Sequence, residues 1–246
     1  MFTQERQNQI LAELQQAGRV EVAALAQRHG VSEHTIRRDL GVLEQRGHLQ
    51  KAHGGAVALD TPHLDWIGRA GALPEAKDRI GQIAAALIMP GQTLFLDAGS
   101  TTLAFARRLT VRPVTVITNS LDIAAILEAE ADVALIVTGG IWDRVSRSFH
   151  GTAARETVCR YRADWTILGT CALHQHAGAT AIQESEAAMK REMAAAGLHT
   201  MVLADHSKRD IVVAHAVLTP AQIGTLVTDH PWPELEALGV RVLTNP

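Results

Sequence analysis

Hydrophobic positions recur at helical spacing through most of residues 3–58, and glycines interrupt the pattern. The first helical stretch ends at Gly18 and carries one apolar face, formed by Ile10, Leu11 and Leu14. Residues 19–22 alternate polar and apolar side chains, which indicates a short extended piece. A second helix is predicted over 21–28, and Gly30 follows it at a position suited to a tight turn.

A third helix and a hairpin complete this region. Ser32 is suited to cap the helix predicted over 33–46, whose core-facing positions are Ile36, Leu40 and Leu43. Residues 48–59 then predict a two-stranded hairpin that turns near Gly54-Gly55. Helices joined by a turn and followed by a hairpin predict a winged helix-turn-helix domain.

From residue 75 onward, strongly apolar strands alternate with amphipathic helices. Strands are expected over 93–97, 114–118, 133–138, 165–169, 200–205, 212–218, 225–229 and 240–243. Helices are expected over 75–88, 101–109, 121–128, 153–160 and 184–196. The first strands are almost entirely apolar, as strands covered on both faces must be. The fold class expected for this region is therefore α/β, a mostly parallel, doubly wound, Rossmann-like sheet.

The change of pattern near residue 60 predicts two domains. We expect a winged helix-turn-helix domain over 1–58, a linker over 59–74 and an α/β domain over 75–246. The linker contains two prolines and two glycines with little periodicity, and Trp66 is placed to pack it against the second domain.

Composition narrows the class of protein. With 246 residues, 47% hydrophobic and 20% charged, the chain is able to build a core, which excludes disorder or a coiled coil for the whole. Aromatic residues make up only 4%, too few for an aromatic platform that stacks single-stranded bases. The start of the chain lacks the pattern of a secretion signal, and no apolar stretch approaches the ~20 residues that cross a bilayer. We expect a cytoplasmic protein that contacts no membrane.

Metal and cofactor sites are not expected from the residue pattern. Cys159 and Cys171 are the only cysteines, too few for a disulfide framework or a cysteine-built zinc site. His174 and His176 form the one close histidine pair along the sequence, and exposed loop histidines are the favoured interpretation of it.

Charge differs between the two predicted domains. The net charge of −3 argues against nucleic acid as a partner when the chain is taken as a whole. Residues 1–58 alone carry seven Lys or Arg and six Asp or Glu, a balance of +1, and the remainder carries −4. The acidic balance therefore belongs to the second domain and does not exclude DNA binding by the first.

The outward face of the third helix carries the candidate chemistry of the first domain. His34, Arg38, Gly41 and Gln45 point away from the core, with Thr35 and Arg37 on the flanks. Guanidinium groups bind guanine or phosphate through two hydrogen bonds. The alternative is that Arg37 and Arg38 form a solvated face and pair with Asp39 or Glu33. The turn before the helix and the hairpin after it favour DNA binding.

The segment Val31-Ser-Glu-His-Thr-Ile-Arg-Arg-Asp-Leu40, with Leu43 and His53-Gly-Gly-Ala56, resembles the DNA-binding domain of DeoR-type bacterial transcriptional regulators. The resemblance implies a recognition helix in the major groove of double-stranded operator DNA and a wing that touches the backbone. The candidate DNA-contacting residues are Ser32, His34, Thr35, Arg37, Arg38, Lys51 and His53.

Five predicted strands end in polar or Gly-rich segments, at 97–102, 118–120, 138–140, 169–171 and 205–208. Ligands bind beyond the carboxyl ends of such strands. Gly99 permits a tight turn, and the residues after it place hydroxyl and N–H groups at a helix N-terminus, which favours an anion. Each segment taken alone is equally an ordinary turn or cap, but together they predict a site for a small molecule that carries a phosphate. The candidate effector-binding residues are Asp97, Gly99, Ser100, Thr101, Thr102, Asn119, Ser120, Gly139, Gly140, Asp205 and Lys208.

The second region also resembles the DeoR family, in its effector-sensing half, which is similar to the fold of ribose-phosphate isomerase and glucosamine-phosphate deaminase. Matching stretches include 95–102, 118–121, 186–191 and 203–208. The resemblance implies a phosphorylated sugar or related metabolite as effector, and carboxylates that accept hydrogen bonds from its hydroxyls. Residues 169–178 depart from the family pattern.

We therefore expect a regulator of a sugar or carbohydrate catabolic operon, a repressor that acts as a homodimer or homotetramer and has no catalytic residue. One alternative is a sugar-phosphate isomerase with Asp97 or Asp205 as general base. Another is a nucleoid-type DNA binder without an effector, which would not require the polar segment at 97–102.

Overall fold

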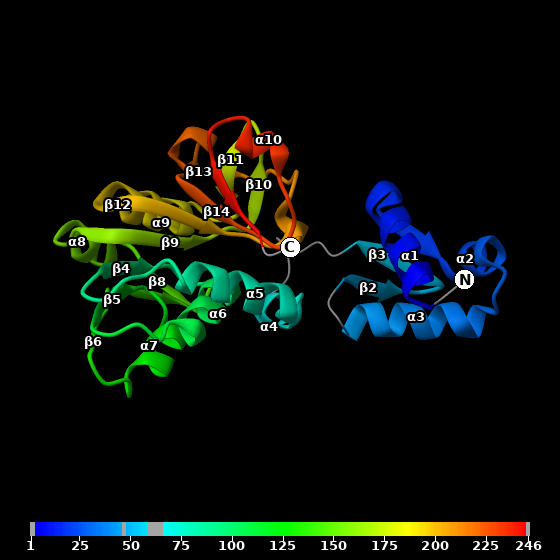
Figure 1. Ribbon diagram of the computed structural model, residues 1–246, viewed down its shortest axis with the longest axis horizontal. Helices are drawn as coiled ribbons and strands as arrows, with labels where there is room; N and C mark the ends of the chain where they lie inside the picture. The colour runs from blue at the N-terminus through cyan, green and yellow to red at the C-terminus, as the bar shows by residue number, and fades with distance from the viewer. Residues whose placement is uncertain (1–2, 46–47, 59–65, 245–246) are drawn as a thin grey trace. The chain divides into compact units, whose positions relative to one another are not determined.

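The computed structural model describes residues 3–45, 48–58 and 66–244 (Figure 1). Contacts divide the chain into two compact units. The first comprises Met1–Thr61 with Gly71–Pro74, and the second comprises Pro62–Ala70 with Glu75–Pro246. Each unit is described separately.

The first unit is a winged helix-turn-helix, as its hydrophobic pattern predicts. Its elements are α1 (Thr3–Ala17), β1 (Arg19–Glu21), α2 (Val22–His29), α3 (Glu33–Gln45), β2 (Leu49–Ala52) and β3 (Gly55–Ala58). The predicted core positions Ile36, Leu40 and Leu43 are at most 2% exposed. Gly30 caps α2 in the left-handed conformation, at φ 63°. A Cβ at Gly55 would lie 2.0 Å from the Val20 carbonyl oxygen, so only glycine fits where β3 pairs with β1.

The second unit is built on a seven-stranded sheet in which every pairing is parallel. The strands, in spatial order, are β15 (Arg241–Leu243), β14 (Thr225–Val227), β12 (Gly197–Leu203), β9 (Ala163–Gly169), β4 (Thr93–Leu96), β5 (Val114–Thr118) and β6 (Val133–Val137). The chain adds strands on one side of β4 as far as β6 and then returns to add β9 and the rest on the other. The strand order therefore reverses between β4 and β9.

Helices cover both faces of this sheet, which confirms the doubly wound arrangement. One face packs on α8 (Thr152–Cys159) and α9 (Glu184–Ala196), and Phe95 points toward it. The neighbouring residues Leu94 and Leu96 point to the opposite face, in the cluster that contains side chains of α5 (Pro74–Ala85), α6 (Ser100–Arg108) and α7 (Leu121–Leu127). Because successive side chains alternate across a strand, a strand buried on both faces is apolar throughout.

The strand predicted over 212–218 is shorter and does not belong to the parallel sheet. It is β13 (His215–Leu218), and it pairs antiparallel with β11 (Gly178–Ala181), which in turn pairs with β10 (Ala172–His174). An apolar run of this length is compatible with either sheet, and only its partners decide between them. The structure also contains a separate hairpin, β7 (Ile141–Asp143) with β8 (Ser148–His150), which the sequence pattern did not predict.

Part of the predicted linker is helical. Residues 59–65 lie outside the described part of the chain, and α4 covers Trp66–Gly71. Trp66 packs against the apolar cluster of α5 and α6, as expected for this residue. The short elements η2 (His206–Lys208), η3 (Pro220–Gln222) and α10 (Pro233–Glu236) complete the second unit. In the part of the chain described, no helix is long and apolar enough to span a bilayer.

Candidate nucleic-acid interface and ligand site

The start of α3 is built as the sequence predicts. The Ser32 hydroxyl accepts a hydrogen bond from the Thr35 backbone N–H at 3.2 Å and lies 3.0 Å from the Thr35 hydroxyl. This contact occupies a donor that the first turn of a helix leaves without a partner. Ser32 therefore holds the end of α3 from which His34 and Thr35 project.

The two adjacent arginines of α3 differ in their partners. Arg37 pairs with Glu33 one turn earlier, at 2.6 Å, which is one of the pairings considered for a solvated face. Asp39, the other candidate partner, is 3% exposed and is bound by Arg6 at 2.6 Å and by Gln7 at 3.0 Å. Arg38 is exposed and makes no hydrogen bond or ion pair with any described residue. Its guanidinium is free to bind an external acceptor.

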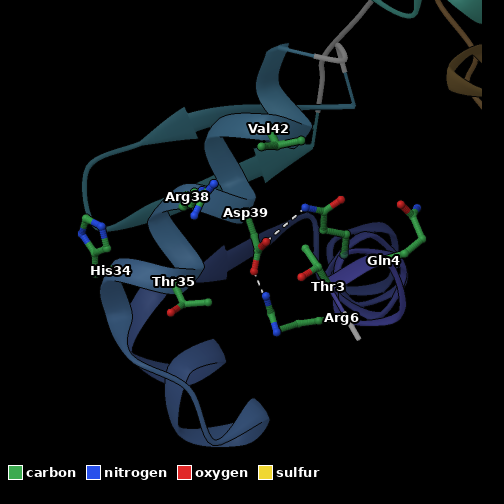
Figure 2. Close-up of a pocket in the computed structure, with 9 residues that line it drawn as sticks. Thr3, Gln4, Arg6, His34, Thr35, Arg38, Asp39 and Val42 are labelled. Atoms are coloured by element: carbon green, nitrogen blue, oxygen red, sulfur yellow. Dashed lines mark hydrogen bonds and ion pairs between the residues drawn. The ribbon is translucent and has the colours of Figure 1, made fainter. Parts of the chain in front are cut away.

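Arg38 lies at a pocket of about 450 Å³ between α1 and α3. Figure 2 shows Asp39 between the two helices, with dashed lines to the side chains that bind it. The lining is mostly polar, and its residues are Thr3, Gln4, Arg6, Gln7, His34, Thr35, Arg38, Asp39 and Val42. The Arg6–Asp39 pair joins α1 to α3 and so helps to fix the position of α3.

The hairpin β2–β3 supplies the remaining candidates. Lys51 and His53 are both exposed on the hairpin, which turns at Gly54 with φ 80°. The Lys51 ammonium lies 3.4 Å from the Glu44 carboxylate, and the same carboxylate accepts the Lys51 backbone N–H at 2.9 Å. Glu44 therefore ties the wing to α3 and partly neutralises Lys51.

In the second unit, the five polar segments follow β12, β9, β4, β5 and β6, which are consecutive neighbours in the sheet. Parallel strands bring their carboxyl ends to one edge, so these segments share that edge. The strand order reverses between β4 and β9, at the place where doubly wound sheets open a crevice for ligands. Asp97 ends β4 and Gly169 ends β9 at this reversal.

A buried ion pair occupies the reversal point. The Asp97 carboxylate is 2% exposed, and it accepts hydrogen bonds from the Lys190 ammonium and, at 3.3 Å, from the Gly169 N–H. Lys190 also donates to the Gly169 carbonyl at 2.9 Å. Burial opposes the charged ammonium, but the charges of Asp97 and Glu186 outweigh burial and raise the pKa of Lys190. Lys190 therefore ties α9 to the ends of both strands.

Two further lysines lie buried near Asp205. Burial lowers the pKa of Lys77 to about 8, against the opposing charge of Asp205, and its ammonium donates to the Arg69 carbonyl. Burial likewise lowers the pKa of Lys208, which is 7% exposed. The Lys208 ammonium and the Arg69 guanidinium make no hydrogen bond or ion pair with a described residue. Asp205 caps η2 by accepting the Ser207 N–H at 3.0 Å.

The hydroxyls and amides of the other predicted site residues serve mainly local structure. Thr102 is fully buried and donates to the Gly99 carbonyl at 3.0 Å. Ser120 caps α7 through the Ile123 N–H at 3.3 Å, as predicted. Asn119 accepts the Ala98 N–H at 2.8 Å and so holds the loop after β4.

The remaining candidates differ in exposure. Ser100 is half-buried and donates to the Arg69 carbonyl at 3.4 Å, whereas Thr101 is 7% exposed. Gly139 and Gly140 have φ of 65° and 105°, and a Cβ at Gly140 would lie 2.6 Å from the His150 carbonyl oxygen. These two glycines are needed for the turn after β6 whether or not a ligand binds there.

Sequence reasoning missed Lys77, Lys190 and Arg69, because it collected residues only at strand ends. The helical spacing of apolar residues could have indicated Lys77. Lys77 stands on the same face of α5 as the buried residues Ile80 and Ala84, at helical spacing. A lysine on an apolar helix face must have a partner or accept a shifted pKa.

The charges at this edge favour an anion. Lys190 interacts electrostatically with Asp97 and Glu186, whereas Lys77 and Lys208 both interact with Asp205 and are both repelled by Arg69. Lys190 is neutralised by Asp97, which leaves the group around Asp205 with more positive than negative charge. A phosphate group supplies the missing negative charge and several strong acceptors.

Comparisons with known proteins match the two parts of the chain separately. A family model described as a DeoR-like helix-turn-helix domain matches residues 6–62, and one described as the DeoR C-terminal sensor domain matches residues 73–230. The chain is 35% identical to a putative aga operon transcriptional repressor of Escherichia coli O157:H7, over 97% of this chain and 91% of that protein. It is 32% identical to the HTH-type transcriptional repressor GlcR of Bacillus subtilis, over 93% of this chain and 89% of that protein.

Two more comparisons are informative in different ways. The glycerol-3-phosphate regulon repressor of Escherichia coli K12 is 30% identical, over 92% of this chain and 96% of that protein. Among solved structures, ribose 5-phosphate isomerase A of Methanocaldococcus jannaschii has a TM-score of 0.41 at 16% identity, over 55% of this chain and 54% of that chain. A structural likeness of this degree carries no information about function.

Proposed function

Since the chain belongs to the DeoR family of transcriptional regulators, we propose that it represses a sugar or carbohydrate catabolic operon and that a phosphorylated sugar or related metabolite controls its binding to operator DNA. The observation that carries the DNA-binding part is Arg38, an exposed guanidinium on the outward face of α3 that has no partner among the described residues. Ser32, His34 and Thr35 stand beside it at the start of the helix. Lys51 and His53 extend the surface to the wing.

Arg37 and Arg38 provide a matched pair of variants for the first test. In a titration of labelled operator DNA, Arg38→Ala should weaken binding by about 1–3 kcal/mol if Arg38 contacts a base. Arg37→Ala should weaken it less, because the Arg37 guanidinium already pairs with Glu33. A loss for Arg38→Ala that is equal on all DNA sequences would assign Arg38 to phosphate instead, and no loss would contradict the proposed surface.

The ligand-binding part rests on the positive charge around Asp205. The Lys208 ammonium and the Arg69 guanidinium offer a bound phosphate two cations that form no hydrogen bond or ion pair with a described residue. Ser100, which donates to the Arg69 carbonyl, stands at the start of α6, where the N–H groups of a helix favour an anion. Asp97 and Asp205 offer carboxylate oxygens to sugar hydroxyls. Relatives named after the glycerol-3-phosphate regulon and the aga operon support a phosphorylated or sugar-related effector.

A thermal-shift screen of the full-length protein tests this part. Sugar phosphates should raise the melting temperature and the matching unphosphorylated sugars should not, since a ligand at 100 times its Kd adds about 2.7 kcal/mol of stability. Lys208→Met should abolish the shift given by the best sugar phosphate. Equal shifts from a phosphorylated and an unphosphorylated sugar would argue against a phosphate-binding group.

An isomerase activity is the second candidate, and the structure favours it less. Of the two carboxylates nominated as general base, Asp97 is bound by Lys190 and Asp205 caps η2. The relatives are named as transcriptional regulators, so we propose that the chain is not an enzyme. Incubation with pentose and hexose phosphates should give no isomerisation, and turnover above about 1 per second would overturn this proposal.

The remaining parts of the proposal concern assembly and place. A regulator that recognises two half-sites needs two reading domains, so we propose a homodimer or a homotetramer. A cytoplasmic location follows from the proposed contact with operator DNA.

A further inference from the structure

His206, Asp229 and His230 meet at the carboxyl ends of two neighbouring strands. His206 stands at the start of η2, shortly after β12, and the other two residues follow β14. β12 and β14 are hydrogen-bonded neighbours, with Leu203 opposite Val227. In the described part of the chain, these three side chains form the one group of at least three metal-ligating residues whose ligand atoms lie close together, all within 4.8 Å of one another.

The carboxylate at the centre of this group is buried and held in position. The Asp229 side chain is 2% exposed, and its Oδ1 accepts the His206 backbone N–H at 2.7 Å. Its Oδ2 faces both imidazoles, at 2.6 Å from His206 Nδ1 and 3.3 Å from His230 Nδ1. Two ring nitrogens are thus directed at a single oxygen.

We propose that His206, Asp229 and His230 bind a divalent transition-metal ion, zinc in the first place. Imidazole nitrogen and carboxylate oxygen are zinc ligands with bonds of about 2.0–2.2 Å, which place neighbouring ligands of a tetrahedral site roughly 3.3 Å apart. The distance of 3.3 Å between Asp229 and His230 already has this value. For a metal ion to bind, the distance between His206 Nδ1 and Asp229 Oδ2 must increase from 2.6 Å to roughly 3.3 Å, a movement of less than about 1 Å.

Exposure of the group suits an exchangeable ion. The side chains of His206 and His230 are 23% and 61% exposed, so solvent reaches the site, and a water molecule is able to complete the coordination. The hydrogen bond from the His206 N–H orients the carboxylate, as partners beyond the ligands do in zinc sites. Zinc, cobalt and nickel all accept this nitrogen and oxygen donor set.

The histidine pair His174 and His176 lacks two features of the proposed metal site. His174 and His176 lie close together, but His174 Nδ1 accepts the backbone N–H groups of His176 and Ala177, at 3.1 and 3.4 Å. That nitrogen is used by the turn, and within residues 3–45, 48–58 and 66–244 no carboxylate joins the pair to form a group of three ligands. His176 is therefore a matched control, an exposed histidine outside the proposed site.

The test uses the full-length protein after treatment with a chelator and dialysis. Titration with Zn²⁺ alone, followed by calorimetry, should show one site per chain. His230→Gln and His206→Gln should each weaken Zn²⁺ binding by at least about 10- to 100-fold. That is the loss of metal affinity seen when a residue that only hydrogen-bonds to a zinc ligand is replaced. His176→Gln should leave the affinity unchanged. Co²⁺ should give visible absorption bands of a tetrahedral site, which His230→Gln removes.

Two outcomes would overturn the proposal. One is the absence of stoichiometric binding by the chelator-treated protein, which would make the group a set of hydrogen-bonded histidines around a carboxylate. The other is equal loss of binding in His176→Gln and His230→Gln. Circular dichroism of each variant checks the fold, and because His230 is the most exposed of the three, its replacement is the variant least able to act through unfolding.

Discussion

Two buried lysines of the second unit differ in the direction in which their pKa is shifted. Lys77 and Lys190 are only 4% and 5% exposed, although lysine is rarely buried without a partner. Lys190 has Asp97 as a direct partner and its pKa is raised, whereas burial dominates at Lys77 and lowers its pKa to about 8. The same residue type is therefore kept charged by a direct carboxylate partner at one position and has its charged form disfavoured by burial at another.

The lowered pKa of Lys77 makes stability depend on pH in a defined direction. The folded state holds fewer protons than the unfolded state between about pH 8 and the ordinary lysine value of 10.5, so stability rises with pH through that window. Relative to Lys77→Met, the unchanged protein should gain up to about 2 kcal/mol between about pH 7.5 and pH 10. Urea unfolding at both pH values measures this gain.

Lys51→Met is the control for this prediction, because it removes an exposed lysine. Its unfolding free energy should follow that of the unchanged protein at both pH values. If Lys77→Met also follows it in parallel, the Lys77 ammonium is not desolvated in the folded protein.

Among the elements, α3 depends on α1 for its position. Asp39 projects from the inner side of α3 and receives hydrogen bonds from Arg6 and Gln7 of α1 (Figure 2). The wing is joined to the same helix through Glu44 and Lys51. α3 is thus held by polar contacts on two sides, in addition to its apolar face.

Removing one partner of the buried Arg6–Asp39 pair should be costly. Asp39→Ala leaves the Arg6 guanidinium buried without its carboxylate, for which a loss of about 3–5 kcal/mol is expected. The double variant Arg6→Met with Asp39→Leu removes both charges and should recover most of that loss. Denaturant unfolding of both variants distinguishes them, and equal stability of the two would show that the buried charge is not the cause.

For the whole molecule, the proposed regulation requires that a sensor unit and a DNA-binding unit affect each other. Such coupling is reciprocal, so operator DNA should change the affinity for the effector by the same factor by which the effector changes the affinity for operator. Titration of the best sugar phosphate with and without saturating operator measures the factor. Equal ligand affinities in the two titrations would contradict the allosteric part and leave DNA binding itself untouched.

Local features were predictable from the sequence because they depend on neighbouring residues. The α3 core face, the Ser32 cap and the hairpin at Gly54 follow from periodicity and turn chemistry within a few positions. The five polar strand ends were found in the same way, and the parallel sheet then placed them on one edge. The roles of the individual site residues in DNA and ligand binding stay predictions.

Partners distant along the chain were not predictable. Nothing near Asp39 indicates Arg6, and nothing near Asp97 indicates Lys190. The strand predicted over 212–218 had the right type and the wrong sheet, because hydrophobicity shows that a strand is buried and does not show which strand it pairs with.

The sequence by itself determined the two kinds of unit, the recognition helix and the edge of the sheet at which a ligand is expected. Periodicity and capping are properties of short segments, so they can be recognised from the sequence without knowledge of the fold. Only the tertiary structure decided that Arg37 is paired while Arg38 has no partner among the described residues, that Lys190 from α9 reaches the strand ends, and that His206 meets Asp229 and His230. Charge pairing and metal ligation act over a few ångströms, and folding alone determines which distant residues come that close.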